Sequence, residues 1–101
     1  MMRIIKATTL SAYWTSHPET RSSLEHWILL TRASAWQTML DVQEAFPKAK
    51  VLNAERARFE VAGGNYRLIT AFKFVPQIAY FVFIGTHAEY DRIDAKTIWK
   101  Y

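Results

Sequence analysis

The stretch RARFEVAGGNYRLITAFKFVPQIAYFVFI, residues 56–84, decides the fold because polar and apolar residues alternate along much of it, as they do in β-strands. Gly63-Gly64-Asn65 supplies residues that tolerate positive φ, which a tight hairpin requires, and Pro76-Gln77 turns the chain a second time. The last run, Ile78–Ile84, is apolar on both faces, as in a central strand that is buried on both sides. The predicted strands are residues 56–61, 66–75 and 78–84, in an antiparallel meander.

Helical spacing replaces this alternation in the residues before the stretch. Ile4-Ile5 predicts a short strand, and Pro18 suits the first turn of a later helix. Ser34-Ala35-Trp36-Gln37 has the form of a capping box, which predicts a further helix that ends at Pro47. A first helix is predicted by apolar residues with i, i+3, i+4 spacing, namely Leu10, Tyr13 and Trp14. The pattern therefore predicts an α+β fold whose helices pack on one face of the sheet.

The composition excludes several classes of site. A length of 101 residues suits one small domain, residues 1–101. The chain has no cysteine, which excludes disulfides, thiolate zinc sites and a cysteine nucleophile. His17, His26 and His87 are too few and too scattered for a histidine-rich metal site, and we expect no cofactor. Without a signal-peptide core or the roughly 20-residue apolar run of a spanning helix, the chain is expected to be cytoplasmic and to have no membrane partner.

The net charge of +4 lies entirely in the second half of the chain. Residues 1–47 contain four basic and four acidic side chains, whereas residues 48–101 contain nine basic and five acidic ones. An excess of cations favours a polyanionic partner, which this distribution places on the predicted strands and the residues after them.

A short helix is predicted directly after the last strand. Thr86-His87-Ala88-Glu89 is a second capping box, with the threonine and the glutamate three residues apart. In the helix that it begins, His87, Tyr90 and Asp91 have i, i+3, i+4 spacing and share one side of the first turn.

The predicted hairpin brings a basic residue to this helix. If Pro76-Gln77 forms the whole turn, Arg67 pairs near Thr86 and lies within one residue of His87 across the ladder. Lys73 then lies about 20 Å from Arg67, at ~3.3 Å per residue, and belongs to the periphery.

An imidazole beside a guanidinium, with a phenol one helical turn away, suits RNA cleavage without a metal ion. A base must take the proton of the ribose 2′-OH, a cation must stabilise the phosphorane oxygens, and an acid must protonate the leaving 5′-oxygen. His87 is the candidate acid or base because imidazole titrates near neutral pH. Arg67 suits the phosphate through its planar fork of donors. Tyr90 would orient the substrate or stack on it, and Asp91 would orient its neighbours.

Each of these residues also has a structural interpretation. His87 would be a hydrogen-bonding histidine at a helix start, and Tyr90 would pack in the core with its hydroxyl in water. Arg67 would form an ion pair with Glu60 or Asp91, which is a common role for an arginine on a strand.

Further basic residues are candidates for RNA binding around this cluster, and they are Arg56, Arg58, Lys73 and Arg92. For Arg56 and Arg58, a solvated strand edge is the alternative interpretation.

Two segments carry a resemblance to a known family. They are Gly64-Asn65-Tyr66-Arg67-Leu68-Ile69 and Phe83-Ile84-Gly85-Thr86-His87-Ala88-Glu89-Tyr90-Asp91. Both resemble the HigB-type toxins, a branch of the RelE-like mRNA interferases. The resemblance extends through most of the chain and includes His17-Pro18, Trp27 and Ala45-Phe46-Pro47.

The resemblance assigns the site residues position by position. Arg67, His87, Tyr90 and Asp91 match the motif of the family and become the catalytic candidates. Asn65 matches as well, although a role in the turn is enough to explain it.

The resemblance also implies a fold and an activity. The fold would have a short N-terminal strand and helices packed on a curved antiparallel sheet, with a short C-terminal helix. The protein would be the toxin of a type II toxin-antitoxin system, an endoribonuclease that cleaves mRNA through its 2′-OH, typically in the ribosomal A site, and so inhibits translation. Its partners would be mRNA, the ribosome and a cognate HigA-like helix-turn-helix antitoxin, through which alone it would contact DNA.

A non-catalytic module that keeps the fold and binds RNA or an antitoxin is the alternative function. A short helix-turn-helix gene directly beside this one would favour the toxin, and the absence of such a gene would favour the binding module.

Overall fold

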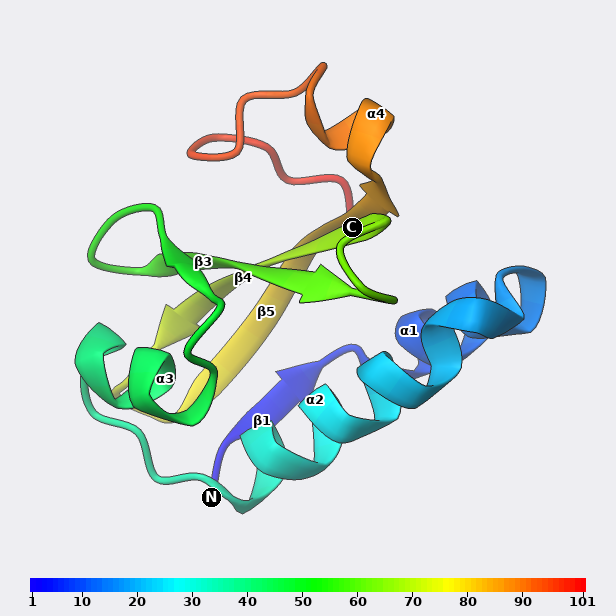
Figure 1. Ribbon diagram of the computed structural model, residues 1–101. Helices are drawn as coiled ribbons and strands as arrows, with labels where there is room; N and C mark the ends of the chain where they lie inside the picture. Colours follow the sequence, from blue (N-terminus) through cyan, green and yellow to red (C-terminus); the bar gives the residue numbers. More distant parts are fainter.

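The alternating stretch forms three strands of a single sheet, and the computed structural model describes residues 1–101. The sheet has five strands in the order β1-β5-β4-β3-β2. The strands are β1 (Arg3–Ile5), β2 (Lys50–Val51), β3 (Arg56–Val61), β4 (Tyr66–Lys73) and β5 (Ile78–Thr86). The helices are α1 (Ala7–Ser16), α2 (Arg21–Ala33), α3 (Met39–Ala45) and α4 (His87–Tyr90), with a 3₁₀ turn at Pro18–Thr20. The predicted α+β class is confirmed (Figure 1).

The sheet contains the predicted meander and one parallel edge. Strands β2 to β5 pair antiparallel with one another in chain order. The edge strand β1 runs parallel to β5, with Ile5 opposite Tyr80, so the sheet as a whole is mixed. Parallel neighbours need a long connection, which here consists of helices α1 to α3 and the other strands. In this order β4 is the central strand, and β5 lies between β4 and β1.

Different parts of the chain cover the two faces of the sheet. Helices α1 to α3 cover the face that carries the main core, whereas α4 and residues 91–101 lie across the sheet from them (Figure 1). Among the fully buried side chains of the main core are Leu10, Leu24, Leu68, Phe72 and Phe81. Burial of each such side chain contributes about 2 kcal/mol to folding. The opposite face, called the second face below, carries a smaller buried cluster of Ile69, Ala71, Val82 and Phe83.

A β-bulge changes the predicted register between β4 and β5. Ile69 pairs with Phe83 and Thr70 with Phe81, so that Val82 is an extra residue in β5. The turn is also longer than predicted, because β4 ends at Lys73 and four residues separate it from β5. Arg67 therefore pairs with Gly85, next to the predicted Thr86 and two residues before His87 instead of one.

The third helix begins later than the sequence predicts. Ser34 ends α2, and its hydroxyl donates to the Thr31 carbonyl at 2.7 Å. The cap of α3 is Thr38, whose Oγ1 accepts from the Asp41 N–H at 3.4 Å. Residues 34–37 are not helical, because Trp36 lies in this connection and packs its ring against the main core. The predicted capping box at Ser34 is therefore wrong.

The C-terminal residues are fixed to the second face. Arg56 Nη1 donates to the carbonyls of Ala95, at 3.1 Å, and Ile98, at 2.7 Å. The Lys100 N–H donates to the Val82 carbonyl at 2.8 Å. The apolar end of the chain therefore docks on the domain. No helix in the structure combines the length and the apolar character needed to cross a membrane.

Candidate active site

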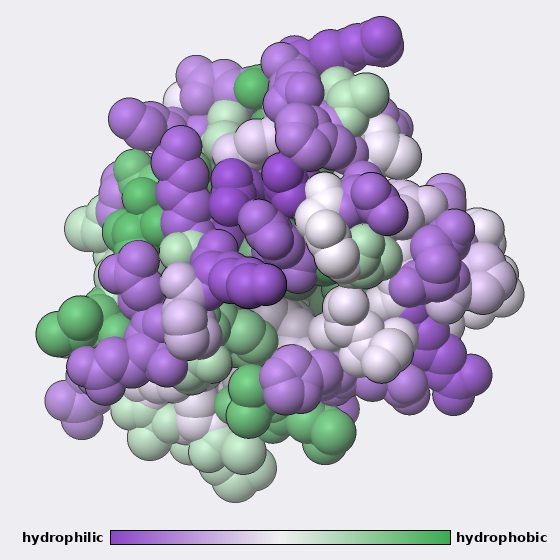
Figure 2. Space-filling view, in the orientation of Figure 1, coloured by the Kyte–Doolittle hydropathy of each residue, from purple (hydrophilic) through white to green (hydrophobic).

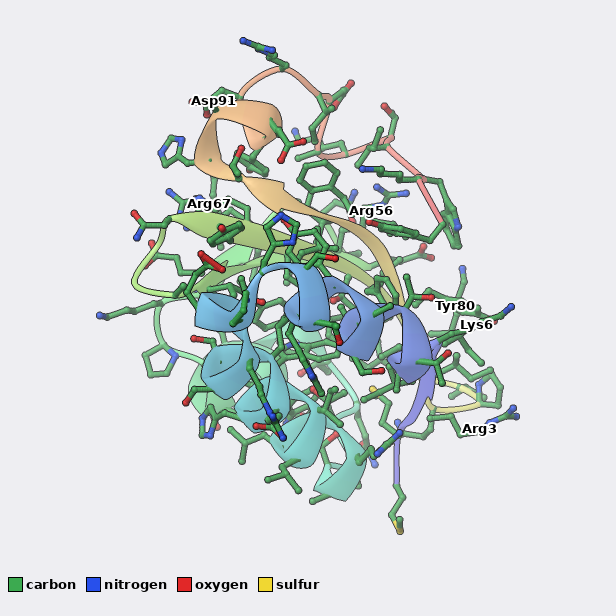
Figure 3. The ribbon with its side chains drawn as sticks, turned by 90° about the vertical axis from the view of Figure 1, so that its right-hand side faces the viewer. Arg3, Lys6, Arg56, Arg67, Tyr80 and Asp91 are labelled. Carbon is green, nitrogen blue, oxygen red and sulfur yellow. The ribbon has the colours of Figure 1, made fainter.

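The polar candidates gather at one end of the second face. Arg58 and Glu60 come from β3, Arg67 comes from β4, and His87 and Asp91 come from α4 and its last turn. Figure 3 shows Arg67 and Asp91 at the same end of the molecule. Figure 2 shows hydrophilic side chains over α4, the C-terminal residues and the β3–β4 hairpin, whereas apolar side chains lie mainly near α3 and the end of α2.

The hairpin turn positions Arg67. Ala62, Gly63 and Gly64 all have positive φ, of 53°, 69° and 93°. Arg67 Nη1 donates to the Gly64 carbonyl at 2.8 Å, and a Cβ added to Gly64 would lie 3.1 Å from that nitrogen. Glycine is therefore required at this position by both the backbone conformation and the approach of the guanidinium. The turn is tied to α2 through the Ala62 N–H, which donates to Ser23 Oγ at 3.0 Å.

Two arginines share one carboxylate beside this turn. Glu60 Oε2 lies 3.7 Å from Arg58 Nη2 and 3.8 Å from Arg67 Nη1. Both arginine Nε atoms are buried and have no hydrogen-bond partner. Two guanidinium groups share a single carboxylate, so the cluster keeps one excess positive charge, which suits an added anion. We call Arg58, Glu60 and Arg67 the guanidinium cluster.

The ion pair of Arg67 with Glu60, which was the structural alternative, is present. The Arg67 side chain is only 10% exposed, so the pair is partly buried.

The predicted capping box holds α4 in place. Thr86 Oγ1 accepts from the Glu89 N–H at 3.1 Å, and Glu89 Oε1 accepts from the Thr86 N–H at 2.8 Å. The His87 N–H donates to the Asn65 carbonyl at 2.9 Å, which joins the start of α4 to the hairpin turn. Because Arg67 lies opposite Gly85, two residues before His87, the hairpin and α4 bring the guanidinium cluster and the histidine to the same end of the sheet.

His87 and Asp91 form a pair on α4. His87 Nδ1 lies 2.9 Å from Asp91 Oδ2, and the two side chains are 54% and 58% exposed. An ionised carboxylate only accepts hydrogen bonds, so Nδ1 carries the proton and Nε2 is left free. This arrangement presents an accessible ring nitrogen that can accept or donate a proton. The predicted i, i+4 relation of these two residues is confirmed.

The carboxylate of Glu89 is held in its ionised form. Hydrogen bonds from the backbone and the side chain of Thr86 lower the pKa of Glu89, with smaller contributions from Lys100 and His17. The negative charge has the opposite effect on the phenols around it. Burial first, and Glu89 second, raise the pKa of Tyr13 and of Tyr101, so both phenols stay neutral.

Several predicted residues lie away from this arrangement or serve the structure. Arg56 is 9% exposed and holds the C-terminal residues, so its interpretation as a solvated edge is wrong. Lys73 is at the far end of β4, where its Nζ lies 3.3 Å from both carboxylate oxygens of Glu55. Tyr90 is half-buried and packs against the buried cluster of the second face. Arg92 is exposed, just after α4, and makes no ion pair.

Two charged residues of this region escaped the sequence prediction as site residues. Glu60 bridges the two arginines, and its place on the same strand face as Arg58 was the available signal. Lys50 pairs with Arg58 across β2 and β3 and is exposed. The two-residue strand β2 is too short to produce an alternating pattern. Nowhere in the structure do three His, Asp or Glu side chains gather as the ligands of a metal ion would.

Comparison with known proteins adds one finding. A family model described as HigB_toxin, the RelE-like toxic component of a toxin-antitoxin system, matches residues 20–93. The matched range includes the guanidinium cluster, the hairpin and α4. None of the curated proteins matches the chain.

Proposed function

We propose that this chain, which belongs to the HigB family of RelE-like toxic components of toxin-antitoxin systems, is an endoribonuclease that cleaves mRNA. The observation that carries the proposal is the placement of the His87–Asp91 pair and the guanidinium cluster at one end of the second face. Such a site combines a proton-transfer group with unfilled donors for a phosphate.

The cleavage step follows from these groups. The ribose 2′-oxygen loses its proton to a base and attacks the adjacent phosphorus, and the 5′-oxygen leaves after an acid protonates it. The products are a 2′,3′-cyclic phosphate and a 5′-hydroxyl. His87 Nε2 serves as the acid or the base, while Asp91 keeps Nδ1 protonated and stabilises the imidazolium.

Charge on the phosphorane oxygens is stabilised by arginine. Arg67 is held by the Gly64 carbonyl through Nη1 alone, so Nη2 makes no hydrogen bond within the protein. A preorganised cation of this kind stabilises the transition state without rearranging during the reaction. Arg58 and Arg92 supply further positive charge for RNA, and Tyr90, three residues after His87, orients the substrate or stacks on it.

The ribosome is the proposed setting of the reaction. A net charge of +4 is small for a nuclease that must hold RNA by itself, whereas a ribosome positions the message in the A site. Cleavage there inhibits translation in the cytoplasm. The antitoxin expected of this family is proposed to be a HigA-like helix-turn-helix protein, and DNA would be contacted only through it.

Growth arrest on expression tests the site. The wild-type chain is expected to arrest growth, and His87→Ala and Arg67→Ala are expected to abolish the arrest while circular dichroism shows both to be folded. Arg67→Lys keeps the charge and removes the planar fork, so it covers the case in which Arg67→Ala misfolds. Lys73→Ala, at the far end of β4, is the control and should arrest growth normally. Arrest by both folded alanine variants at the wild-type level would refute the site.

Primer extension on mRNA tests the activity. New 5′ ends are expected when the purified chain is added to a translating extract, and few or none are expected on the same mRNA without ribosomes. If no new ends form in either reaction, the chain is the non-catalytic binding module and not a nuclease.

A further inference from the structure

We propose that a pocket at the β1 edge of the sheet binds a nucleobase of the same RNA strand, several nucleotides from the cleaved bond. The inference rests on the proposed function in that its ligand is RNA, but it concerns binding and not cleavage. We call this site the edge pocket.

The edge pocket lies where β1 ends and β5 continues. Its volume is about 490 Å³, within the range of sites that hold a small organic ligand. Ile5, Lys6 and Thr9 line it from the end of β1 and the start of α1. The remaining lining is aromatic and comes from β5 and the C-terminus, namely Tyr80, Phe81, Trp99 and Tyr101. Figure 3 shows Tyr80 and Lys6 next to each other at this edge.

The aromatic rings are exposed although their backbone is fixed. Trp99 is 53% exposed and Tyr101 is 43% exposed. The residues beside Trp99 are held by hydrogen bonds, from Arg56 to the Ile98 carbonyl and from the Lys100 N–H to the Val82 carbonyl. Trp99 also lies 5.7 Å from the ring of Tyr80, centroid to centroid. Large apolar rings that stay in water on a fixed backbone provide a platform on which a base can stack.

The charges around the edge pocket fit a nucleic acid. Lys6 is the only charged residue in its lining, and it forms no ion pair. Arg3 is exposed on β1, two residues before Ile5, and so lies on the same sheet face as Tyr80. Lys100 Nζ lies 5.7 Å from the centroid of the Tyr101 ring. A stacking surface with cations beside it is the combination that binds single-stranded RNA through its bases and phosphates.

The distance to the candidate active site fixes which part of the RNA is bound. Tyr80 and Thr86 are six residues apart on β5, which corresponds to about 20 Å at ~3.3 Å per residue. The edge pocket is therefore too far from His87 to hold the nucleotide that is cut. Residues of the C-terminal segment, among them Ile93 and Ile98, cover the second face between the two sites, so an RNA strand that reached both would pass over that segment.

Binding of an uncleavable oligonucleotide tests the inference. The probe is a fluorescein-labelled 2′-O-methyl RNA of about ten nucleotides, whose affinity for the purified chain is measured by fluorescence anisotropy at several salt concentrations. Trp99→Ala is expected to weaken binding by about 5- to 100-fold, the range for loss of one base-stacking ring. Lys6→Gln is expected to reduce the slope of log K against log salt by about 0.7, as for one lost phosphate contact.

Matched variants separate stacking from folding. Trp99→Leu keeps an apolar side chain against Tyr80 but removes the stacking ring. Trp99→Leu should therefore weaken RNA binding as much as Trp99→Ala does, while its melting temperature stays close to that of the wild type. Lys48→Gln, at an exposed lysine outside the edge pocket, should leave both affinity and salt slope unchanged.

The outcomes distinguish this inference from the proposed function. Binding that depends on Trp99 and Lys6 in a chain that cleaves no mRNA supports the edge pocket and refutes the nuclease. If the Trp99 and Lys6 variants all bind the RNA probe as the wild type does and cleave mRNA at the wild-type rate, the edge pocket is refuted and the proposed nuclease function is not. Loss of antitoxin binding in these variants, with RNA binding unchanged, would identify the edge pocket as a protein interface and overturn the inference.

Discussion

Arg56 and Arg67 lie on the same face of the sheet, and each is 9% exposed. Their guanidinium groups differ in the hydrogen-bond partners that the protein provides. Arg56 Nη1 donates to two carbonyls of the C-terminal residues, and its guanidinium carbon lies 5.8 Å from the Trp99 ring centroid. Arg67 has one carbonyl, one distant carboxylate and a buried Nε without a partner.

The comparison shows that burial alone does not identify a functional arginine. At the Arg56 end, the protein provides the hydrogen-bond acceptors, and the side chain holds the C-terminal residues on the second face. At the Arg67 end, Nη2 makes no hydrogen bond within the protein and one positive charge is in excess, which suits an anion from outside. The predictions below test this difference, from the largest expected effect to the smallest.

Replacing each arginine by alanine should affect different properties of the protein. Arg67→Ala should lower the rate of mRNA cleavage by about 10²- to 10³-fold, because it removes the cation that stabilises the phosphorane. Cleavage rates in a translating extract measure this effect, with Arg56→Ala as the comparison. A larger loss of cleavage in folded Arg56→Ala than in Arg67→Ala would reverse the assignment of the two ends.

Arg56→Ala should mainly lower stability. Loss of a charged donor that serves two carbonyls should reduce the free energy of unfolding by about 2–3 kcal/mol. Urea denaturation measures this change. The C-terminal residues should also become sensitive to a protease such as trypsin, at Lys96 or Lys100, before the rest of the domain. A melting curve and a cleavage pattern identical to those of the wild type would contradict the role of Arg56.

Gly64→Ala should disturb the Arg67 end through the backbone. A residue with a Cβ in the left-handed conformation costs about 1–2 kcal/mol, and the methyl group would also press on Arg67 Nη1. We expect a lower melting temperature together with reduced cleavage. Gly63→Ala is the control, because a Cβ there meets no atom within 4 Å and only the conformational cost remains. Equal activity of the two variants would show that the contact with Arg67 does not matter.

Lowering the pH should first destabilise α4, which lies at the Arg67 end of the second face. The pKa of Glu89 is lowered in the folded chain, so the stability that its capping box provides is present above the pKa of the unfolded glutamate, about 4.3. That stability is lost as the pH falls through the lower pKa of the folded state. Glu89→Gln should therefore reduce the dependence of the unfolding free energy on pH below about 5. Acid dependence equal to that of the wild type would contradict this role.

The sequence predicted those parts of the molecule that depend on neighbouring residues. Alternation located β3, β4 and β5, and the spacing of Thr86 and Glu89 located α4 with its His87–Asp91 pair. Both features are local, because a strand pattern repeats every two residues and a capping box spans four.

Features that depend on distant residues were missed. The role of Arg56 depends on carbonyls about 40 positions later in the chain, and the path of those residues has no pattern of its own. Ser34 resembles a helix start in sequence, but it ends α2, and both its backbone N–H and its hydroxyl donate to the Thr31 carbonyl. The register at Arg67 differs from the prediction by one residue, because the longer turn shifts it by two and the bulge, which the apolar pattern does not reveal, restores one.

The bulge at Val82 determines which residues of β5 share a side of the sheet. In a regular strand, residues five apart point to opposite faces, so Tyr80 and Gly85 would lie on different sides of the sheet. The extra residue shifts the phase of β5 by one, and Val82 and Phe83 both join the buried cluster of the second face. Even-numbered residues before the bulge and odd-numbered residues after it thus share one side. A single inserted residue thus puts Gly85, which pairs with Arg67, on the same side of the sheet as Tyr80.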